Sequence, residues 1–189
     1  MKKIHKIYIL GTYFCISLPI YLMVGFKYFG HLSGFLCWLL LAMNFVGFSC
    51  LRRNRRKTID AIVANIKATG QFVPGYEVRS DWDIKYMGID THNGTILYIG
   101  IRLDKDCIDV IGFDARGFLQ TQYEGYELTC HTKLVSSPVI SIKTKKTTQD
   151  LIYTMTSRHY DHSAGFFNLV KDKRKELEKL AGTPIPEAH

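Results

Sequence analysis

Residues 85–113, KYMGIDTHNGTILYIGIRLDKDCIDVIGF, decide the fold class of this chain. The segments 85–90 and 95–102 are β-prone and flank the sequence THNG (91–94). An Asn-Gly pair between two such segments is the strongest short signal for a β-hairpin. A charged turn then leads into a third apolar segment, 107–113. The stretch therefore predicts at least three antiparallel strands.

The same pattern continues toward the C-terminus. Three more strands are expected at 118–123, 126–132 and 139–143, with Gly, Asp, Ser and Pro in the breaks between them. Six short strands at a spacing of about ten residues predict a strongly bent antiparallel sheet or a small barrel. One helix, capped by Thr147 or Thr148, and a second over 166–181 are expected to cap that sheet.

Two uncharged runs precede the β region, at 7–26 and 32–51. As helices, both are long enough to cross a hydrocarbon core of roughly 30 Å. Basic residues flank the pair, which predicts a two-helix transmembrane hairpin with both outer flanks in the cytoplasm. The residues expected to set topology and contact lipid head groups are Lys2, Lys3, Lys6, Arg52, Arg53, Arg55, Arg56 and Lys57.

Asn44 is the most polar residue in the second run. An amide in a membrane needs a partner, so we expect a contact with the first helix; recognition of a partner protein within the membrane is the alternative.

Four regions follow from these patterns. Residues 58–76 predict a connecting helix and linker, because apolar residues recur at helical spacing up to Ile66 and Pro74-Gly75 then breaks the chain. The expected domains are a transmembrane hairpin (1–57), this connecting segment (58–76), a cytoplasmic β domain with a capping helix (77–162), and a C-terminal amphipathic helix and tail (163–189).

The net charge of +8 does not indicate nucleic-acid binding once its position is considered. Residues 1–57 contain nine Lys or Arg and no acidic residue, whereas residues 58–189 contain sixteen basic and seventeen acidic residues. The excess positive charge flanks the predicted spans, and the β domain is close to neutral. We therefore expect no nucleic-acid partner.

Candidate chemical groups are sparse. Asp81 and Asp83 would share a strand face and could hold a metal, but no His or Gly-rich loop stands nearby. Asp104, Asp106 and Asp109 lack the glycine and terminal glutamate of a calcium loop, so a charged turn is the simpler interpretation.

Two further groups contain histidine. His159, Asp161 and His162 come nearest to a metal cluster, although His is also favoured at a helix C-terminus. Cys130 and His131 are adjacent strand residues, which point to opposite faces and cannot easily act together. The sequence thus predicts no catalytic residue, no metal site, no cofactor and no enzymatic activity.

Binding is the remaining class of function. Lys143, Lys145 and Lys146 form a cluster that could contact lipid or a partner protein, and a solvated loop of lysines is the alternative interpretation.

The order of these features, with GIDTHNGTILYIGI, VIGFDARGF, YELTCHTK and SSPVISIK leading into a helix, resembles the surface exclusion proteins of IncI-type conjugative plasmids. The region from about Asp83 to His159 resembles a small PH-like barrel capped by a helix. This resemblance implies a membrane-anchored α+β protein of the bacterial inner membrane, multi-pass, with both termini in the cytoplasm. It also implies that the chain blocks redundant plasmid transfer by responding to a component of the donor's mating apparatus.

Two alternatives stay open at this point. One is a membrane-tethered PH-like module that assembles oligomers or binds membrane lipids. The other is a membrane-anchored hydrolase or metalloenzyme that uses the aspartates near residue 81 or the histidines near residue 159. The partner is expected to be a mating-apparatus component or a second copy of the chain.

Overall fold

The structure is a computed structural model. It describes residues 31–80, 83–102, 105–114, 117–135, 138–158, 160 and 165–187. The chain divides into two compact units, residues 1–54 and 55–189, which are treated separately below.

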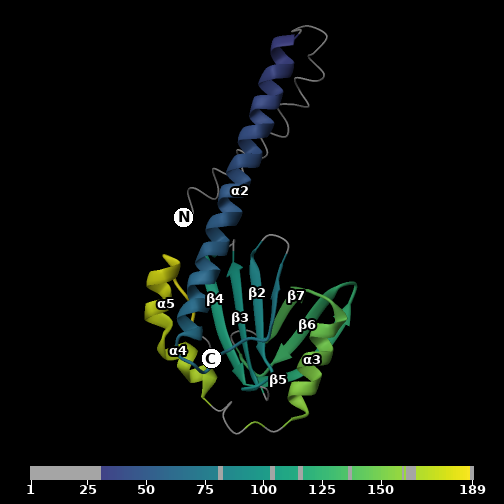
Figure 1. Cartoon of the computed structure of the whole chain (residues 1–189), viewed down its shortest axis with the longest axis vertical. Coiled ribbons are helices and arrows are strands. Elements are labelled where there is room, and N and C mark those ends of the chain that lie inside the picture. Colours follow the sequence, from purple (N-terminus) through teal and green to yellow (C-terminus); the bar gives the residue numbers. More distant parts are fainter. Residues whose placement is uncertain are drawn as a thin grey trace. The chain divides into compact units, whose positions relative to one another are not determined.

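The elements of the second unit are strands followed by short helices (Figure 1). Helix α2 enters this unit from the first. The elements are α2 (His31–Lys67), β1 (Tyr76–Arg79), β2 (Lys85–Asp90), β3 (Thr95–Arg102), β4 (Cys107–Asp114), β5 (Phe118–Glu124), β6 (Glu127–Thr132), β7 (Val139–Lys143), α3 (Lys146–Thr156), α4 (Phe166–Asp172) and α5 (Arg174–Ala181).

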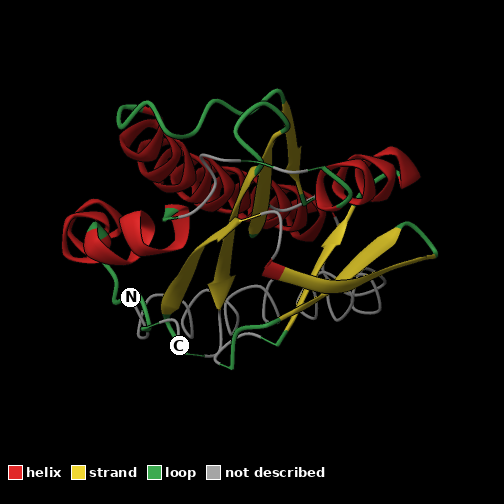
Figure 2. Ribbon diagram, turned by 90° about the horizontal axis from the view of Figure 1, so that it is seen from below, coloured by secondary structure: helices red, strands yellow, loops and turns green. Residues whose placement is uncertain are grey.

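The strands form two antiparallel sheets (Figure 2). The first has the order β1-β2-β3-β4 and the second β5-β6-β7, so the strands that pair within each sheet are consecutive in the sequence, and the break between the sheets falls between β4 and β5. This α+β architecture with antiparallel sheets confirms the strand prediction. Strands β2, β3 and β7 begin and end at the predicted residues, and β4, β5 and β6 differ by one residue at one end.

The β2–β3 hairpin forms where THNG predicts it. Asp90 is buried, and its carboxylate accepts hydrogen bonds from the backbone N–H groups of His92 and Asn93, at 2.9 and 3.0 Å. Gly94 then adopts a φ of 67°, which a residue without a Cβ reaches without steric cost. The turn therefore satisfies backbone N–H groups of its own residues by hydrogen bonds, and it fixes the register of both strands.

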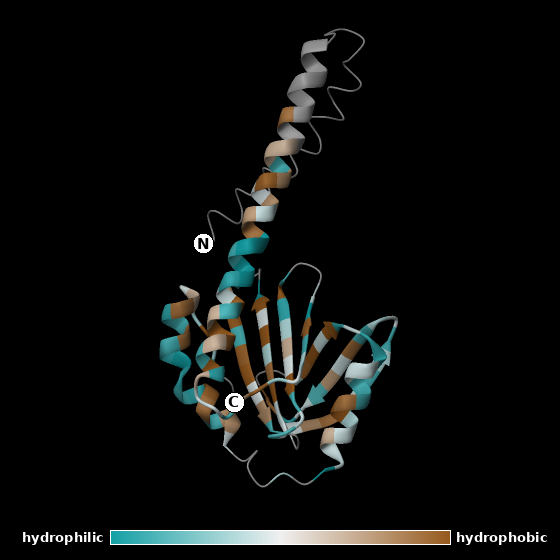
Figure 3. Ribbon diagram, in the orientation of Figure 1, coloured by the Kyte–Doolittle hydropathy of each residue, from teal (hydrophilic) through white to brown (hydrophobic). Residues whose placement is uncertain are grey.

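Each face of the first sheet is buried. One face packs against the second sheet and α3 in a core that includes Met87, Ile96, Leu128 and Ile152. The other face packs against the last turns of α2 and against α4 and α5, with Ile62 and Val170 among the contacts. Figure 3 shows hydrophobic residues concentrated in the strands of the first sheet, whereas α5 is largely hydrophilic.

Three local predictions need correction. Strand β1 is a seventh strand that the sequence does not predict: its first residue, Tyr76, falls in the predicted linker after Pro74-Gly75, and the strand forms by pairing with β2. The helix predicted over 166–181 is two helices, which meet at Lys173. Helix α3 begins without a threonine cap: Lys145 is its N-cap residue, and the Thr148 hydroxyl instead hydrogen-bonds to the Thr144 hydroxyl at 2.5 Å.

The predicted transmembrane hairpin is also corrected. No helix among the described residues combines the length and apolar content needed to cross a bilayer. This contradicts the hairpin and the multi-pass inner-membrane location inferred from it. The sequence interpretation took 32–51 as a separate span, whereas these residues belong to α2, which continues through the basic residues to Lys67. The first predicted span, 7–26, lies outside the described residues.

Candidate functional site

The three lysines of the predicted binding cluster lie where β7 leads into α3. Lys143 is the last residue of β7, and Lys145 and Lys146 stand at the start of α3. All three are exposed, and none forms an ion pair with another described residue. An ammonium group that forms no ion pair within the described part of the chain is available to a partner molecule.

Strand pairing brings an exposed tyrosine to these lysines. The backbone N–H of Thr144 donates a hydrogen bond of 2.9 Å to the carbonyl of Tyr126, in the β5–β6 turn, and Lys143 lies opposite Glu127. The side chain of Tyr126 is 76 % exposed. We call the surface formed by Tyr126, Lys143, Lys145 and Lys146 the basic tip.

The sequence interpretation found the lysines of the basic tip but treated Tyr126 as the first residue of a strand. The structure places it in a two-residue turn, with Gly125 at φ 54° and Tyr126 at φ 68°. The signal in the sequence was the pattern Glu-Gly-Tyr-Glu, because a glycine between two β-prone segments marks a hairpin turn.

The remaining basic candidates are partly described. The basic residues from 52 to 57 lie on α2, and Arg56 is near the Asp60 carboxylate, at 4.0 Å, with both side chains at least half exposed. Asn44 also lies on α2 and is half-buried. Lys2, Lys3 and Lys6 lie outside the described residues. Their predicted lipid contacts stay predictions.

The aspartate candidates are scattered. Asp83 is buried, and its backbone N–H donates to the Ser80 carbonyl at 3.0 Å. Asp109 forms an ion pair with Arg102 across β3 and β4, and Asp106 lies in the turn between those strands. Among the described residues, no three His, Cys, Asp or Glu side chains are arranged to hold a metal ion. Asp81, Asp104, His159, Asp161 and His162 lie outside the described part of the chain.

Cys130 and His131 occupy opposite faces of β6. The Cys130 side chain is fully buried, and burial raises the pKa of its thiol to about 12, so the thiolate is strongly disfavoured. His131 lies half-buried on the other face. This geometry offers no activated nucleophile.

A cleft of about 330 Å³ opens between the two sheets. On one wall, the Lys85 ammonium donates hydrogen bonds to the carbonyl and hydroxyl oxygens of Ser141, at 2.7 and 3.0 Å. The Arg102–Asp109 pair lies on another wall, and Tyr98 lines the interior. Burial, aided by the nearby Asp109 carboxylate, raises the pKa of Tyr98 to about 12, so its phenol stays protonated. Sequence reasoning missed this cleft, because its walls come from distant strands.

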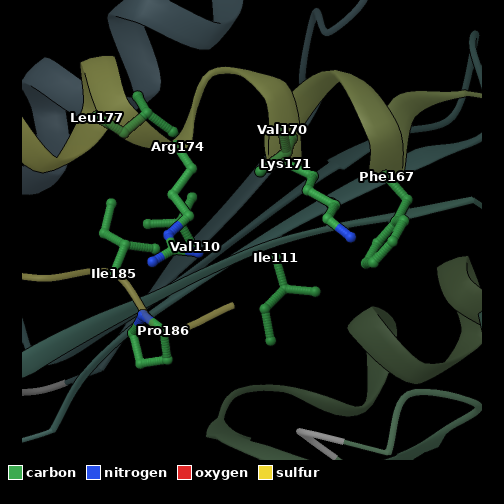
Figure 4. Close-up of a pocket in the computed structure, with 10 residues that line it drawn as sticks. Val110, Ile111, Phe167, Val170, Lys171, Arg174, Leu177, Ile185 and Pro186 are labelled. Carbon is green, nitrogen blue, oxygen red and sulfur yellow. The ribbon is translucent and has the colours of Figure 1, made fainter. Parts of the chain in front are cut away.

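A second pocket lies between β4 and the C-terminal helices (Figure 4). Phe167 and Lys171 extend from α4 toward Ile111, while Ile185 and Pro186 close the opposite side. Its volume is about 20 Å³, which is room for about one water molecule. This pocket is therefore a small gap between packed elements and not a ligand site.

The described domain thus consists of two antiparallel sheets with short helices, an exposed basic tip and a cleft of modest size. The exclusion-determining protein family matches residues 6–188 of the 189-residue sequence, and the chain belongs to that family. No curated protein and no solved structure matches the chain significantly. Membership supports the predicted role in surface exclusion.

Proposed function

We propose that this chain excludes redundant conjugative plasmids by binding a protein of the donor's mating apparatus, without catalysing a reaction. Membership of the exclusion-determining family supports the exclusion role. The basic tip is the observation that favours protein binding, because it gathers three exposed lysines that lack ion pairs with other described residues around an exposed tyrosine. Tyrosine is enriched at protein interfaces.

We further propose that the domain is PH-like and that the plasmid system is of the IncI type. The order of four antiparallel strands, three antiparallel strands and a helix supports the first proposal. The sequence resemblance described above supports the second.

A mating assay tests the proposed function. Recipients that express the full chain should receive a matched plasmid less often than recipients with an empty vector, and should receive an unrelated plasmid equally often. Unchanged transfer from every matched donor would overturn the proposal.

A charge variant tests the basic tip. The triple substitution K143Q/K145Q/K146Q should weaken exclusion, because it removes the positive charges offered to the partner. The matched control is K105Q/K175Q/K179Q, which neutralises three other exposed lysines and should exclude like the unmodified chain. Equal exclusion by both variants would show that the three lysines of the basic tip do not take part in recognition.

A further inference from the structure

Tyr126 occupies a backbone conformation that disfavours its side chain. Both central residues of the β5–β6 turn have positive φ, which is the pattern of a type I′ hairpin turn. That turn favours Gly, Asn and Asp at both positions, whereas a bulky residue at positive φ is strained.

The other described non-glycine residues with positive φ do not share this strain. They are Asp83 and Asp106, whose short polar side chains tolerate the left-handed region. Among the described residues, Tyr126 is therefore the bulky exception. Strain of this kind costs about 1–3 kcal/mol and is typical of functional positions.

The fold gains little from this side chain. It is 76 % exposed, and its hydroxyl forms no hydrogen bond with a described residue. The hydrogen bond from the Thr144 N–H goes to the backbone carbonyl of Tyr126, so any residue at this position could accept it. Folding alone thus does not account for a tyrosine in this turn.

The charges around the turn indicate the chemistry of its partner. Glu127 lies opposite Lys143 and also opposite Glu124, while Lys145 and Lys146 follow directly in the chain. All five side chains are exposed, and the sum of their formal charges is positive, because three are lysines and two are glutamates. An aromatic ring amid net positive charge fits an apolar pocket rimmed by carboxylates.

We infer that Tyr126 is the anchor residue by which the basic tip selects its partner, a protein surface with an apolar pocket rimmed by acidic side chains. This inference rests on the proposed function. It adds that specificity resides in the ring at position 126 and that the lysines bring the partner to it.

The test separates recognition from folding. Tyr126→Asn places a residue that the turn favours, so the variant should be as stable as the unmodified chain or more stable in urea denaturation. It should nevertheless lose exclusion, with a rise of about tenfold or more in transfer from matched donors, the loss expected for a hot-spot residue. Tyr126→Phe keeps the ring and should retain most of the exclusion.

Tyr153→Ala is the matched control. Tyr153 is 72 % exposed on α3, where its backbone is helical, and its loss should leave exclusion unchanged. Full exclusion by Tyr126→Asn would overturn the inference while leaving the proposed function intact. Failure of the unmodified chain to exclude would overturn both. A lower molar mass of Tyr126→Asn in light scattering would show that the tip binds a second copy, which would also overturn the inference.

Discussion

The rings of Phe72 and Phe166 stack with their centroids 5.4 Å apart and their planes inclined by 21°. Each ring lies over a glycine of the first sheet: a Cβ at Gly88 would approach Phe72 to 2.8 Å, and a Cβ at Gly112 would approach Phe166 to 3.0 Å. Leu97 is the register partner of both glycines. The missing side chains on β2 and β4 thus allow the linker after α2 and the start of α4 to meet on the sheet.

Gly112→Ala should therefore destabilise the domain. The added Cβ would lie 2.8 Å from Val170 Cγ2 and 3.0 Å from the Phe166 ring, closer than packed carbons tolerate. Overpacking of this kind costs about 1–3 kcal/mol, which exceeds the gain of about 0.5–1 kcal/mol that alanine brings over glycine within a strand. The free energy of unfolding in urea measures the difference.

The control for this prediction is Gly75→Ala. Gly75 has no atom within 4 Å of the position its Cβ would take, so the change should be nearly neutral. Equal stability of the two alanine variants would show that α4 does not pack tightly against Gly112.

Short-range chemistry explains why so many strand ends were predicted correctly. Turn residues such as those at 91–94 satisfy their own backbone groups, as the Asp90 carboxylate shows, so the sequence specifies them locally. The packing of the Phe72 and Phe166 rings over Gly88 and Gly112 could not be predicted in this way. It exists only because the register places both glycines beside Leu97, under segments that are distant in the chain.

The incorrect hairpin prediction has a related cause. An apolar run of about twenty residues predicts a span when it is taken alone, whereas the structure assigns 32–51 to a longer helix that ends in a packed amphipathic segment.

The basic tip could be predicted from the sequence only in part. Its lysines stand close together in the sequence and were predicted, but Tyr126 joins them only through the pairing of β6 with β7.

Alkaline pH should destabilise the fold. Burial raises the pKa of Cys130 and that of Tyr98 to about 12, from ordinary values of 9.0 and 10.0. Between pH 9 and 12 the unfolded chain releases protons that the folded chain retains, so the free energy of unfolding falls as the pH rises. Tyr98 alone should account for about 2 kcal/mol at pH 12.

Urea denaturation at pH 8 and at pH 11, together with tyrosinate absorbance, measures this effect. Tyr98→Phe should reduce the pH dependence, whereas Tyr153→Phe, on an exposed ring, should leave it unchanged. A pH dependence that is the same in all three proteins would contradict the assignment to Tyr98.

Lys85 should stabilise the contact between the sheets. Its ammonium on β2 donates to two oxygens of Ser141 on β7, and hydrogen bonds to a charged group contribute about 1.5–3 kcal/mol. Lys85→Met keeps much of the side-chain length but removes the donors, so the urea midpoint should fall. Lys105→Met, at an exposed lysine, is the control and should have little effect. If the two methionine variants unfold at the same midpoint, the contact does not stabilise the fold.

The C-terminal segment should be required for stability. The backbone N–H of Ile108 donates to the carbonyl of Pro184 at 3.2 Å, so the chain after α5 covers the free edge of β4. Ile185 is only 2 % exposed and packs in the core on the helix-covered face of the first sheet. Removal of a buried isoleucine side chain leaves a cavity, and Ile185→Ala should therefore cost about 2–4 kcal/mol.

The control for this prediction is Val73→Ala, which removes apolar atoms from a side chain that is 64 % exposed and should change stability by less than about 0.5 kcal/mol. Thermal unfolding of both variants checks the prediction, and a similar melting temperature for the two would mean that the C-terminal segment is not part of the core.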